Sequence, residues 1–174
     1  TIYAAPANGV LHQDEVNLGD PASMAAHAVS LSGSTVSYTL TALFEGDDET
    51  LVTGGGYHLA PGAALTATLA VDPDARQVLL RRRYDQGYDK EALRIWVNGQ
   101  WAGDWLDGGR NIARRWRESV FQLPPRLTQG QRQLHVRLEP LSWGASQSAT
   151  MARLAALSVY RDENALWLPL VSRQ

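Results

Sequence analysis

Three tryptophans, Trp96, Trp101 and Trp105, lie close together in the middle of the 174-residue chain. An indole ring is rigid and largely apolar, so it can stack on the apolar face of a sugar ring with little loss of entropy. Side chains able to hydrogen-bond to sugar hydroxyls lie near these tryptophans in the sequence: Arg94, Asp104, Asp107 and Asn111. These residue types predict a carbohydrate-binding surface on which the rings stack and the polar groups orient the sugar.

The dipeptide Asn98–Gly99 lies between the first two tryptophans and decides which residues share a face. Asn-Gly is a strong signal for a two-residue hairpin turn, because a type I′ turn needs positive φ at both positions. That turn places Trp96 opposite Trp101 and Ile95 opposite Ala102, and directly opposed residues share a face of the sheet. The aliphatic face, which we expect to pack in the core, is formed by Leu93, Ile95, Val97 and Ala102. The other face carries Arg94, Trp96, Trp101 and Trp105. The alternative is that a loop covers this second face and that the tryptophans are packing residues.

Two groups of arginines follow a first part of the chain that has no basic residue. Residues 1–75 contain nine acidic residues and neither Lys nor Arg. The arginine groups lie at 81–83 and at 114–117, where they surround Trp116. Arginine clusters suit bidentate recognition of carboxylate, phosphate or vicinal hydroxyls, so Trp116 and Arg117 join the predicted sugar-binding residues. The alternative is that the arginines form salt bridges with the acidic first half.

The loop at residues 45–49 reads Glu-Gly-Asp-Asp-Glu and offers hard oxygen ligands at short spacing, which suit Ca²⁺. Asp47, Asp48 and Glu49 are therefore the candidate ligands of a structural calcium ion. The pair at 14–15 is another choice of ligands, and the alternative is that the loop is a solvated turn.

The chain has no cysteine, which excludes disulfides, thiol catalysis and cysteine-based zinc sites. The four histidines do not have the spacing of a zinc motif.

Catalysis has weak support in the sequence. No G-x-S-x-G, Walker A or G-x-G-x-x-G motif is present. A glycosidase needs two carboxylates about 5 to 10 Å apart, and the sequence cannot pair the candidates. These are Asp85, Asp89, Glu91, Asp104, Asp107 and Glu118.

Short strands separated by Gly, Pro, Asn and Asp turns dominate the chain and predict an all-β fold, a β-sandwich or jelly roll of antiparallel strands. The expected strands are residues 15–18, 28–32, 35–44, 65–71, 77–84, 92–97, 100–106, 117–122, 133–139 and 151–160. Turns are expected at 54–56, 72–74, 107–109 and 128–130. One short helical turn is expected after Asp20, which would cap a helix that begins with Pro21. We expect one domain over residues 1–174, with its core at about 14–160 and residues 161–174 as a tail or last strand.

Charge and hydropathy limit the classes of partner. The net charge of −2 argues against a basic nucleic-acid-binding protein. No apolar run approaches 18 residues, so membrane insertion is not expected. Because the chain starts at Thr1 rather than at Met, we expect it to be processed or excised from a longer protein.

Several segments resemble the β-sandwich modules of secreted bacterial glycoside hydrolases. The segments are 79–86 (LLRRRYDQ), 93–105 (LRIWVNGQWAGDW), 115–124 (RWRESVFQLP) and 130–137 (GQRQLHVR), with 20–27 (DPASMAAH) as a further match. They are similar to the jelly-roll and galactose-binding-like modules of arabinofuranosidase- and fructofuranosidase-type enzymes. The resemblance covers residues from about 14 to 160.

The resemblance implies a secreted, bacterial sandwich module that binds carbohydrate and often holds a structural Ca²⁺ ion. The carboxylate-bearing catalytic segment of the enzymes is not found, which favours a non-catalytic carbohydrate-binding module of a polysaccharide-degrading system. Two alternatives remain: a jelly-roll glycoside hydrolase acting on arabinofuranosides or fructofuranosides, and a structural jelly roll whose tryptophan face forms a homo-oligomer interface.

Overall fold

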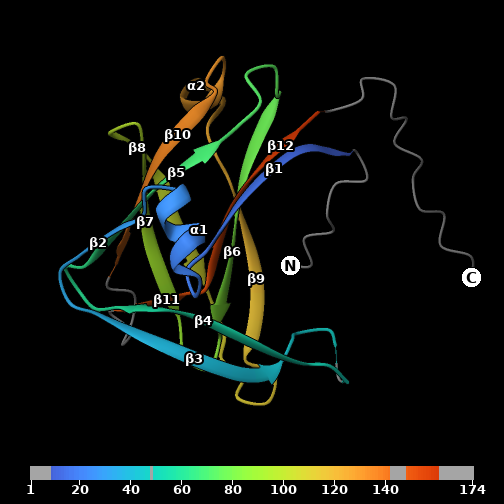
Figure 1. The fold of residues 1–174 in the computed structure, drawn as a ribbon, viewed down its shortest axis with the longest axis vertical. Coiled ribbons are helices and arrows are strands. Elements are labelled where there is room, and N and C mark those ends of the chain that lie inside the picture. The colour runs from blue at the N-terminus through green and yellow to red at the C-terminus, as the bar shows by residue number, and fades with distance from the viewer. Residues whose placement is uncertain (1–8, 48, 142–147, 161–174) are drawn as a thin grey trace, which may run out of the picture.

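A computed structural model describes residues 9–47, 49–141 and 148–160 of the chain (Figure 1). Within these residues the strands pair antiparallel in three sheets. The four-stranded sheet has the order β1 (Val10–Asn17), β12 (Arg153–Val159), β6 (Gln77–Asp85) and β9 (Trp116–Gln122). The five-stranded sheet has the order β2 (Ser30–Ser32), β5 (Ala64–Ala70), β10 (Gln133–Pro140), β7 (Glu91–Val97) and β8 (Gln100–Asp107). The third sheet has the order β11 (Ala149–Met151), β4 (Leu51–Leu59) and β3 (Thr35–Leu43). The predicted all-β sandwich is confirmed.

The core lies between the four- and five-stranded sheets, because alternate residues of their strands point toward the opposite sheet. The inward row of β10 is fully buried and consists of Leu134, Val136 and Leu138. The predicted aliphatic face of β7 is buried as well: Leu93, Ile95 and Val97 all have 0% exposure. This packing leaves the alternate residues of β7 and β10 on the outer face of the five-stranded sheet.

The third sheet crosses one end of the sandwich, as β3 and β4 show at the bottom of Figure 1. We predicted a turn at residues 54–56, and this prediction is wrong, since the three glycines lie inside β4. A Cβ atom at Gly56 would stand 2.2 Å from the carbonyl oxygen of Met151, and one at Gly54 would stand 3.1 Å from the ring of Trp116. The glycines therefore serve close packing of β4 and do not form a turn.

Two short helices lie outside the sheets. The expected helical turn is α1 (Pro21–Ala26), and the Asp20 side chain accepts the capping hydrogen bond from the backbone N–H of Ala22. A second helix, α2 (Pro125–Thr128), occupies the segment just before the predicted turn at 128–130. Among the residues that the structure describes, no helix is long and apolar enough to cross a membrane.

Both halves of the chain contribute strands to the same sheets, and their opposite charges meet. Glu15 on β1 pairs with Arg81 on β6 at 3.1 Å and with Arg153 on β12 at 2.9 Å. Glu45 pairs with Arg117 at 2.9 Å. The expected pairing between the acidic and basic halves is thus present in these contacts. The expected tail or last strand at 161–174 lies outside the described residues.

Candidate functional site

The hairpin of β7 and β8 has the predicted two-residue turn, with φ of 51° at Asn98 and 77° at Gly99. Trp96 lies opposite Trp101, as expected. The register then shifts, because Ile95 pairs with Gly103 and not with Ala102. A β-bulge of this kind inserts one extra residue into one strand, so every later residue of β8 changes face.

The bulge overturns the prediction that Trp105 shares the outer face. Trp105 pairs with Leu93, has 3% exposure and packs against Phe121 in the core, with a centroid distance of 5.8 Å. Gly103 makes the bulge feasible, because its φ of 144° suits glycine and an added Cβ would come within 2.7 Å of the Phe121 ring. A two-residue turn alone therefore did not determine the faces of β8.

The same bulge brings a carboxylate to the outer face. Asp104 pairs across the hairpin with Arg94, whose guanidinium donates to it at 3.0 and 3.3 Å. Trp101, with 52% exposure, donates its indole N–H to the same carboxylate at 3.3 Å. The hydrogen bond from Arg94 lowers the pKa of Asp104, so this carboxylate is ionised at neutral pH.

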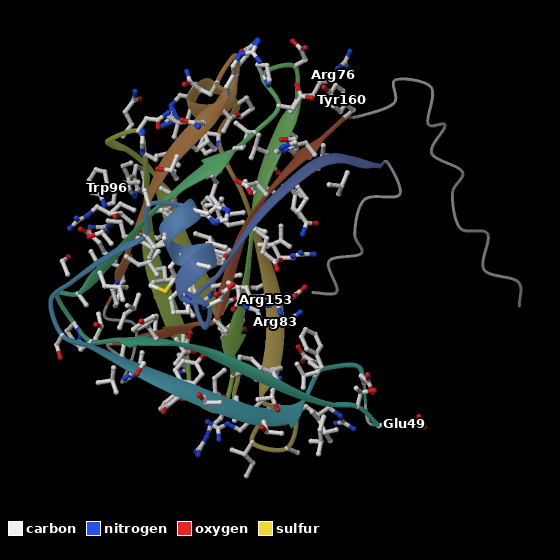
Figure 2. The ribbon with its side chains drawn as sticks, in the orientation of Figure 1. Glu49, Arg76, Arg83, Trp96, Arg153 and Tyr160 are labelled. Atoms are coloured by element: carbon white, nitrogen blue, oxygen red, sulfur yellow. The ribbon has the colours of Figure 1, made fainter. Side chains whose placement is uncertain are left out.

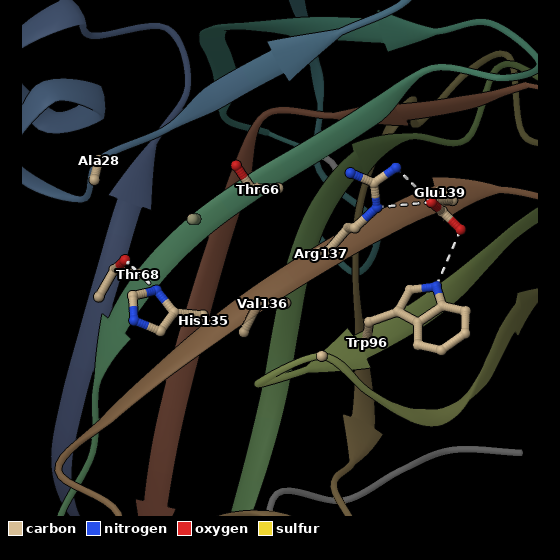
Figure 3. A pocket seen from close by; sticks show the side chains of 10 residues that line it. Ala28, Thr66, Thr68, Trp96, His135, Val136, Arg137 and Glu139 are labelled. Carbon is tan, nitrogen blue, oxygen red and sulfur yellow. Dashed lines mark hydrogen bonds and ion pairs between the residues drawn. The ribbon is translucent and has the colours of Figure 1, made fainter.

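A second ion pair lies next to Trp96 on the neighbouring strand β10. Glu139 accepts from the Trp96 indole N–H at 3.0 Å and from Arg137 at 2.7 Å (Figure 3). Partial burial raises the pKa of Glu139, but the hydrogen bonds from Arg137 and Trp96 outweigh it, so the net pKa is lowered. Each tryptophan of the outer face is thus held by a carboxylate that an arginine neutralises.

A shallow hollow of about 560 Å³ opens beside these groups on the outer face. Figure 3 shows Trp96 and Glu139 at one side of it and Thr68 and His135 at the other. Its lining consists of Ala28, Thr66, Ala67, Thr68, Trp96, Gly99, His135, Val136, Arg137 and Glu139. A hollow with one aromatic wall and with hydroxyl and charged groups offers both ring stacking and hydrogen bonds to a polar ligand.

Sequence reasoning missed the β5 and β10 residues of this face. The strict alternation of Gln133, His135, Arg137 and Glu139 with aliphatic residues was a signal that these four point outward. The sequence does not show that β10 lies between β5 and β7, so it could not bring these residues to Trp96.

Trp116 and Arg117 do not join this face. Trp116 has 0% exposure and donates its indole N–H to the carbonyl of Val52 at 2.9 Å, so the expectation that a sugar ring stacks on it is corrected. Arg117 is occupied by Glu45 and by the carbonyl of Gly108. The physical reason is that β9 begins directly beneath β4, where the large indole fills the space between two sheets.

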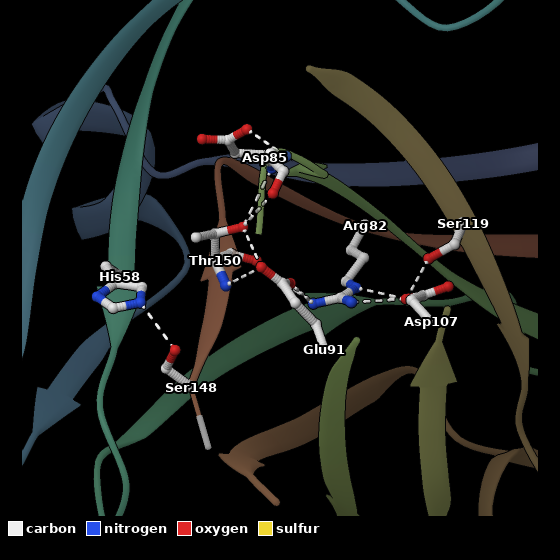
Figure 4. Close-up of polar contacts among 9 residues, drawn as sticks. His58, Arg82, Asp85, Glu91, Asp107, Ser119, Ser148 and Thr150 are labelled. Carbon is white, nitrogen blue, oxygen red and sulfur yellow. Dashed lines mark hydrogen bonds and ion pairs between the residues drawn. The ribbon is translucent and has the colours of Figure 1, made fainter. Parts of the chain in front are cut away.

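Asp107 and Asn111 also lie away from the outer face. Asp107 accepts from Arg82 at 2.6 and 3.0 Å and from Ser119 at 2.8 Å inside the sandwich (Figure 4). The Asn111 side chain accepts from the backbone N–H groups of Ala113 and Arg114, which organises the loop between β8 and β9. The predicted contribution of these residues to sugar binding remains a prediction.

Two of the carboxylates considered for catalysis, Glu91 and Asp107, bond to the same buried arginine. Three others pair with different arginines: Asp85 with Arg115, Asp104 with Arg94 and Glu118 with Arg83. Arg82 has 0% exposure and donates to Glu91 at 3.0 Å as well as to Asp107 (Figure 4). Thr150 donates to Glu91 through its N–H at 3.0 Å and its hydroxyl at 2.7 Å. Burial raises the pKa of Glu91 to about 7 against the opposing effects of Arg82 and Thr150. Because these groups satisfy one another in the interior, their arrangement is that of a structural network.

The proposed calcium loop does not provide a cation site in the part of the chain that the structure describes. Asp47 accepts from the N–H groups of Glu49 and Thr50, which lower its pKa and organise the turn. Figure 2 shows Glu49 at the end of the β3–β4 hairpin, on the opposite side of the view from Trp96. Asp48 lies outside the described residues. Among those described, no group of three or more His, Asp or Glu residues could hold a metal ion.

No protein-family model and no curated protein matches the sequence. Solved structures do match the fold. A family 35 carbohydrate-binding module from Clostridium thermocellum has a TM-score of 0.57 at 16% identity, over 85% of this chain and 99% of the module. CBM35 from Paenibacillus barcinonensis has a TM-score of 0.57 at 14% identity, over 83% and 97% of the two chains.

An enzyme contains a similar unit. The exo-β-1,3-galactanase of Phanerochaete chrysosporium, solved with β-1,3-galactotriose, matches with a TM-score of 0.54 at 13% identity, over 85% of this chain and 30% of the enzyme. At these identities the matches establish the fold alone. The chain therefore has the β-sandwich fold seen in carbohydrate-binding modules.

Proposed function

We propose that this protein is a non-catalytic carbohydrate-binding module and that it binds sugar on the outer face of its five-stranded sheet. The observation that carries the proposal is the pair Trp96 and Trp101, opposed across the hairpin and each bonded to a carboxylate that an arginine neutralises. A single exposed apolar side chain needs no functional explanation, but two opposed indoles with such partners, one of them lining a hollow, favour a binding site.

The chemistry of the face suits a polyol. Trp101 offers an exposed ring for stacking, and the carboxylates of Asp104 and Glu139 accept from sugar hydroxyls while Arg94 and Arg137 donate to them. Because each carboxylate already faces a guanidinium, a hydroxyl can bridge the two without leaving either charge unpaired. Shallow sites of this kind bind with dissociation constants on the order of 10⁻³ to 10⁻⁵ M, or about −4 to −7 kcal/mol.

The structural neighbours support this function by their fold. They include carbohydrate-binding modules of families 35 and 36, the latter from a multidomain xylanase. We propose that the chain serves a secreted bacterial polysaccharide-degrading system in the same way. The finer resemblance to modules of arabinofuranosidase- and fructofuranosidase-type enzymes makes furanose-containing glycans one class to test.

Affinity electrophoresis in gels that contain xylan, arabinan, fructan, β-1,3-glucan or galactan tests the proposal. We expect retardation by at least one polysaccharide, and its loss in Trp96→Ala and Trp101→Ala. Leu51→Ala is the matched control, since Leu51 is 65% exposed but belongs to the third sheet. Undiminished retardation of both tryptophan variants would contradict the binding face.

Two other functions correspond to different outcomes. Hydrolysis of arabinofuranoside or fructofuranoside substrates by the purified chain would establish an enzyme. A stable oligomer in light scattering that dissociates on Trp101→Ala would show that the exposed indole is an interface between copies of the chain. We expect neither, because the carboxylates around Arg82 are buried and the outer face is rich in paired charges, which are depleted from interface cores.

A further inference from the structure

A second hollow lies next to the one beside Trp96, beyond the hairpin turn. The second hollow has a volume of about 570 Å³ and is lined by Asn98, Gly99, Gln100, Arg126, Leu127, Gln131, Gln133 and His135. Gly99 and His135 line both hollows. The two spaces therefore meet at the tip of the hairpin, with β10 beneath them.

The outward residues of β10 form a single row under both hollows. Arg137 and Glu139 line the first, Gln133 lines the second, and His135 lies between them. A β-strand rises about 3.3 Å per residue, so the row from Gln133 to Glu139 extends roughly 20 Å. A single sugar ring would occupy only a part of this length.

The second hollow has a different chemistry from the first. Its lining contains no carboxylate and is dominated by amides, which both donate to and accept from hydroxyls. The Asn98 side-chain oxygen accepts from the backbone N–H of His135 at 2.9 Å, which leaves its NH₂ group to donate. Arg126 reaches the carbonyl of Trp101 at 3.5 Å, so α2 and the hairpin jointly form the wall.

We propose that the two hollows are subsites of one groove, which binds a continuous stretch of a linear glycan along β10. This inference rests on the proposed function and specifies its ligand: an oligosaccharide segment long enough to pass Gly99, rather than a single terminal sugar. In the first subsite, one part of the glycan stacks on the Trp96 ring. The second binds the following units by hydrogen bonds from Gln133 and its neighbouring amides. Most lining residues of the second hollow are exposed, so the bound glycan can continue beyond this hollow into solvent.

Gly99 is the place where the groove can be interrupted without a steric overlap, at the cost of some backbone strain that the control variant below shares. A Cβ atom at this position meets no protein atom within 4 Å, and its φ of 77° is one that Asn tolerates. The Gly99→Asn side chain would stand in open space where the two hollows meet. Gly62 is the matched control, because its φ is 79°, its Cβ position is also open, and it lines neither hollow.

Isothermal titration calorimetry with a length series, from monosaccharide to hexasaccharide, of whichever polysaccharide retards the protein tests the groove. We expect affinity to rise about tenfold or more between disaccharide and hexasaccharide, equivalent to about 1.4 kcal/mol. Gln133→Ala should reduce hexasaccharide affinity to that of the disaccharide and leave disaccharide affinity unchanged, because Gln133 lines only the second hollow. Gly99→Asn alters the boundary of both hollows and should lower the ratio of hexasaccharide to disaccharide affinity. Gly62→Asn should behave as the wild type.

The outcomes separate this inference from the proposed function. Binding that is independent of chain length, or a length dependence that survives both Gly99→Asn and Gln133→Ala, overturns the groove but keeps sugar binding on the outer face. Absence of binding to every polysaccharide and every oligosaccharide overturns both.

Discussion

Glu91 illustrates how one residue links burial to pH dependence. It has 2% exposure, and burial raises its pKa to about 7 from the value of 4.5 expected in an unfolded chain. The folded protein therefore holds this proton more tightly than the unfolded chain does. The resulting stabilisation is complete below about pH 4.5 and is lost as the pH rises toward 7.

We expect the free energy of unfolding to fall by up to about 1 kcal/mol per pH unit between about pH 5 and pH 7 because of Glu91. Glu91→Gln should flatten this slope. Its absolute stability should be lower, because an amide has one acceptor oxygen whereas Arg82 and Thr150 bond to two different oxygens of Glu91. Urea unfolding at several pH values measures the effect. Glu49→Gln removes an equal charge from an exposed position and should retain the wild-type slope. An unchanged slope in Glu91→Gln would show that Glu91 is ionised throughout this range.

The bulge in β8 decides which side chains of this strand lie on the outer face and which face the core. Without the extra residue, Trp105 would lie on the outer face and Asp104 would point inward. The bulge depends on Gly103, whose backbone conformation is rarely adopted by other residues and whose Cα faces the Phe121 ring.

Gly103→Ala should therefore destabilise the protein by about 1 to 3 kcal/mol, because the new methyl group overlaps Phe121 in a packed core. Gly109→Ala is the control: its φ of 95° imposes backbone strain, but its Cβ position is open. Denaturant unfolding measures the free energy of unfolding of both variants. The difference between them reports the cost of steric overlap with Phe121, because both variants carry backbone strain. Equal destabilisation would mean that Phe121 moves aside at no cost and that overlap contributes nothing.

For the whole molecule, Trp116 joins the third sheet to the sandwich. Its indole bonds to Val52 on β4, packs near Tyr38 on β3 with a centroid distance of 6.4 Å, and lies against Gly54. The four tryptophans that the structure describes thus divide into two kinds: Trp105 and Trp116 are buried in the packing between strands, and Trp96 and Trp101 lie on the outer face.

Trp116→Ala should cost about 3 to 5 kcal/mol of stability, as large core truncations do. At a temperature where the variant remains folded, its sugar affinity should be close to that of the wild type. Trp96→Ala should show the reverse, lost binding with a smaller loss of stability. Thermal unfolding and calorimetry on both variants test this separation, and a loss of binding in folded Trp116→Ala would mean that the third sheet contributes to the sugar site.

Several features followed from the sequence by itself, because they depend on local chemistry. Alternating apolar residues and turn dipeptides predicted the fold class. The Asn98–Gly99 dipeptide predicted the hairpin turn, because both residues tolerate positive φ. Asp20 followed by Pro21 predicted the start of the helix. Each of these is a preference of a few adjacent residues. The sequence also placed Trp96 and Trp101 opposite each other, since a two-residue turn determines the first pairs of a hairpin.

Only the tertiary structure decided which strands became neighbours, and this determined the site. The packing of β10 beside β7 brought Arg137 and Glu139 to Trp96, a relation between residues about 40 positions apart that no local pattern encodes. The bulge at Gly103 and the glycines of β4 likewise accommodate side-chain and backbone atoms from distant segments of the chain. Burial of Trp105 and Trp116 follows from the same cause, because a large ring lies wherever the packed sheets leave space for it.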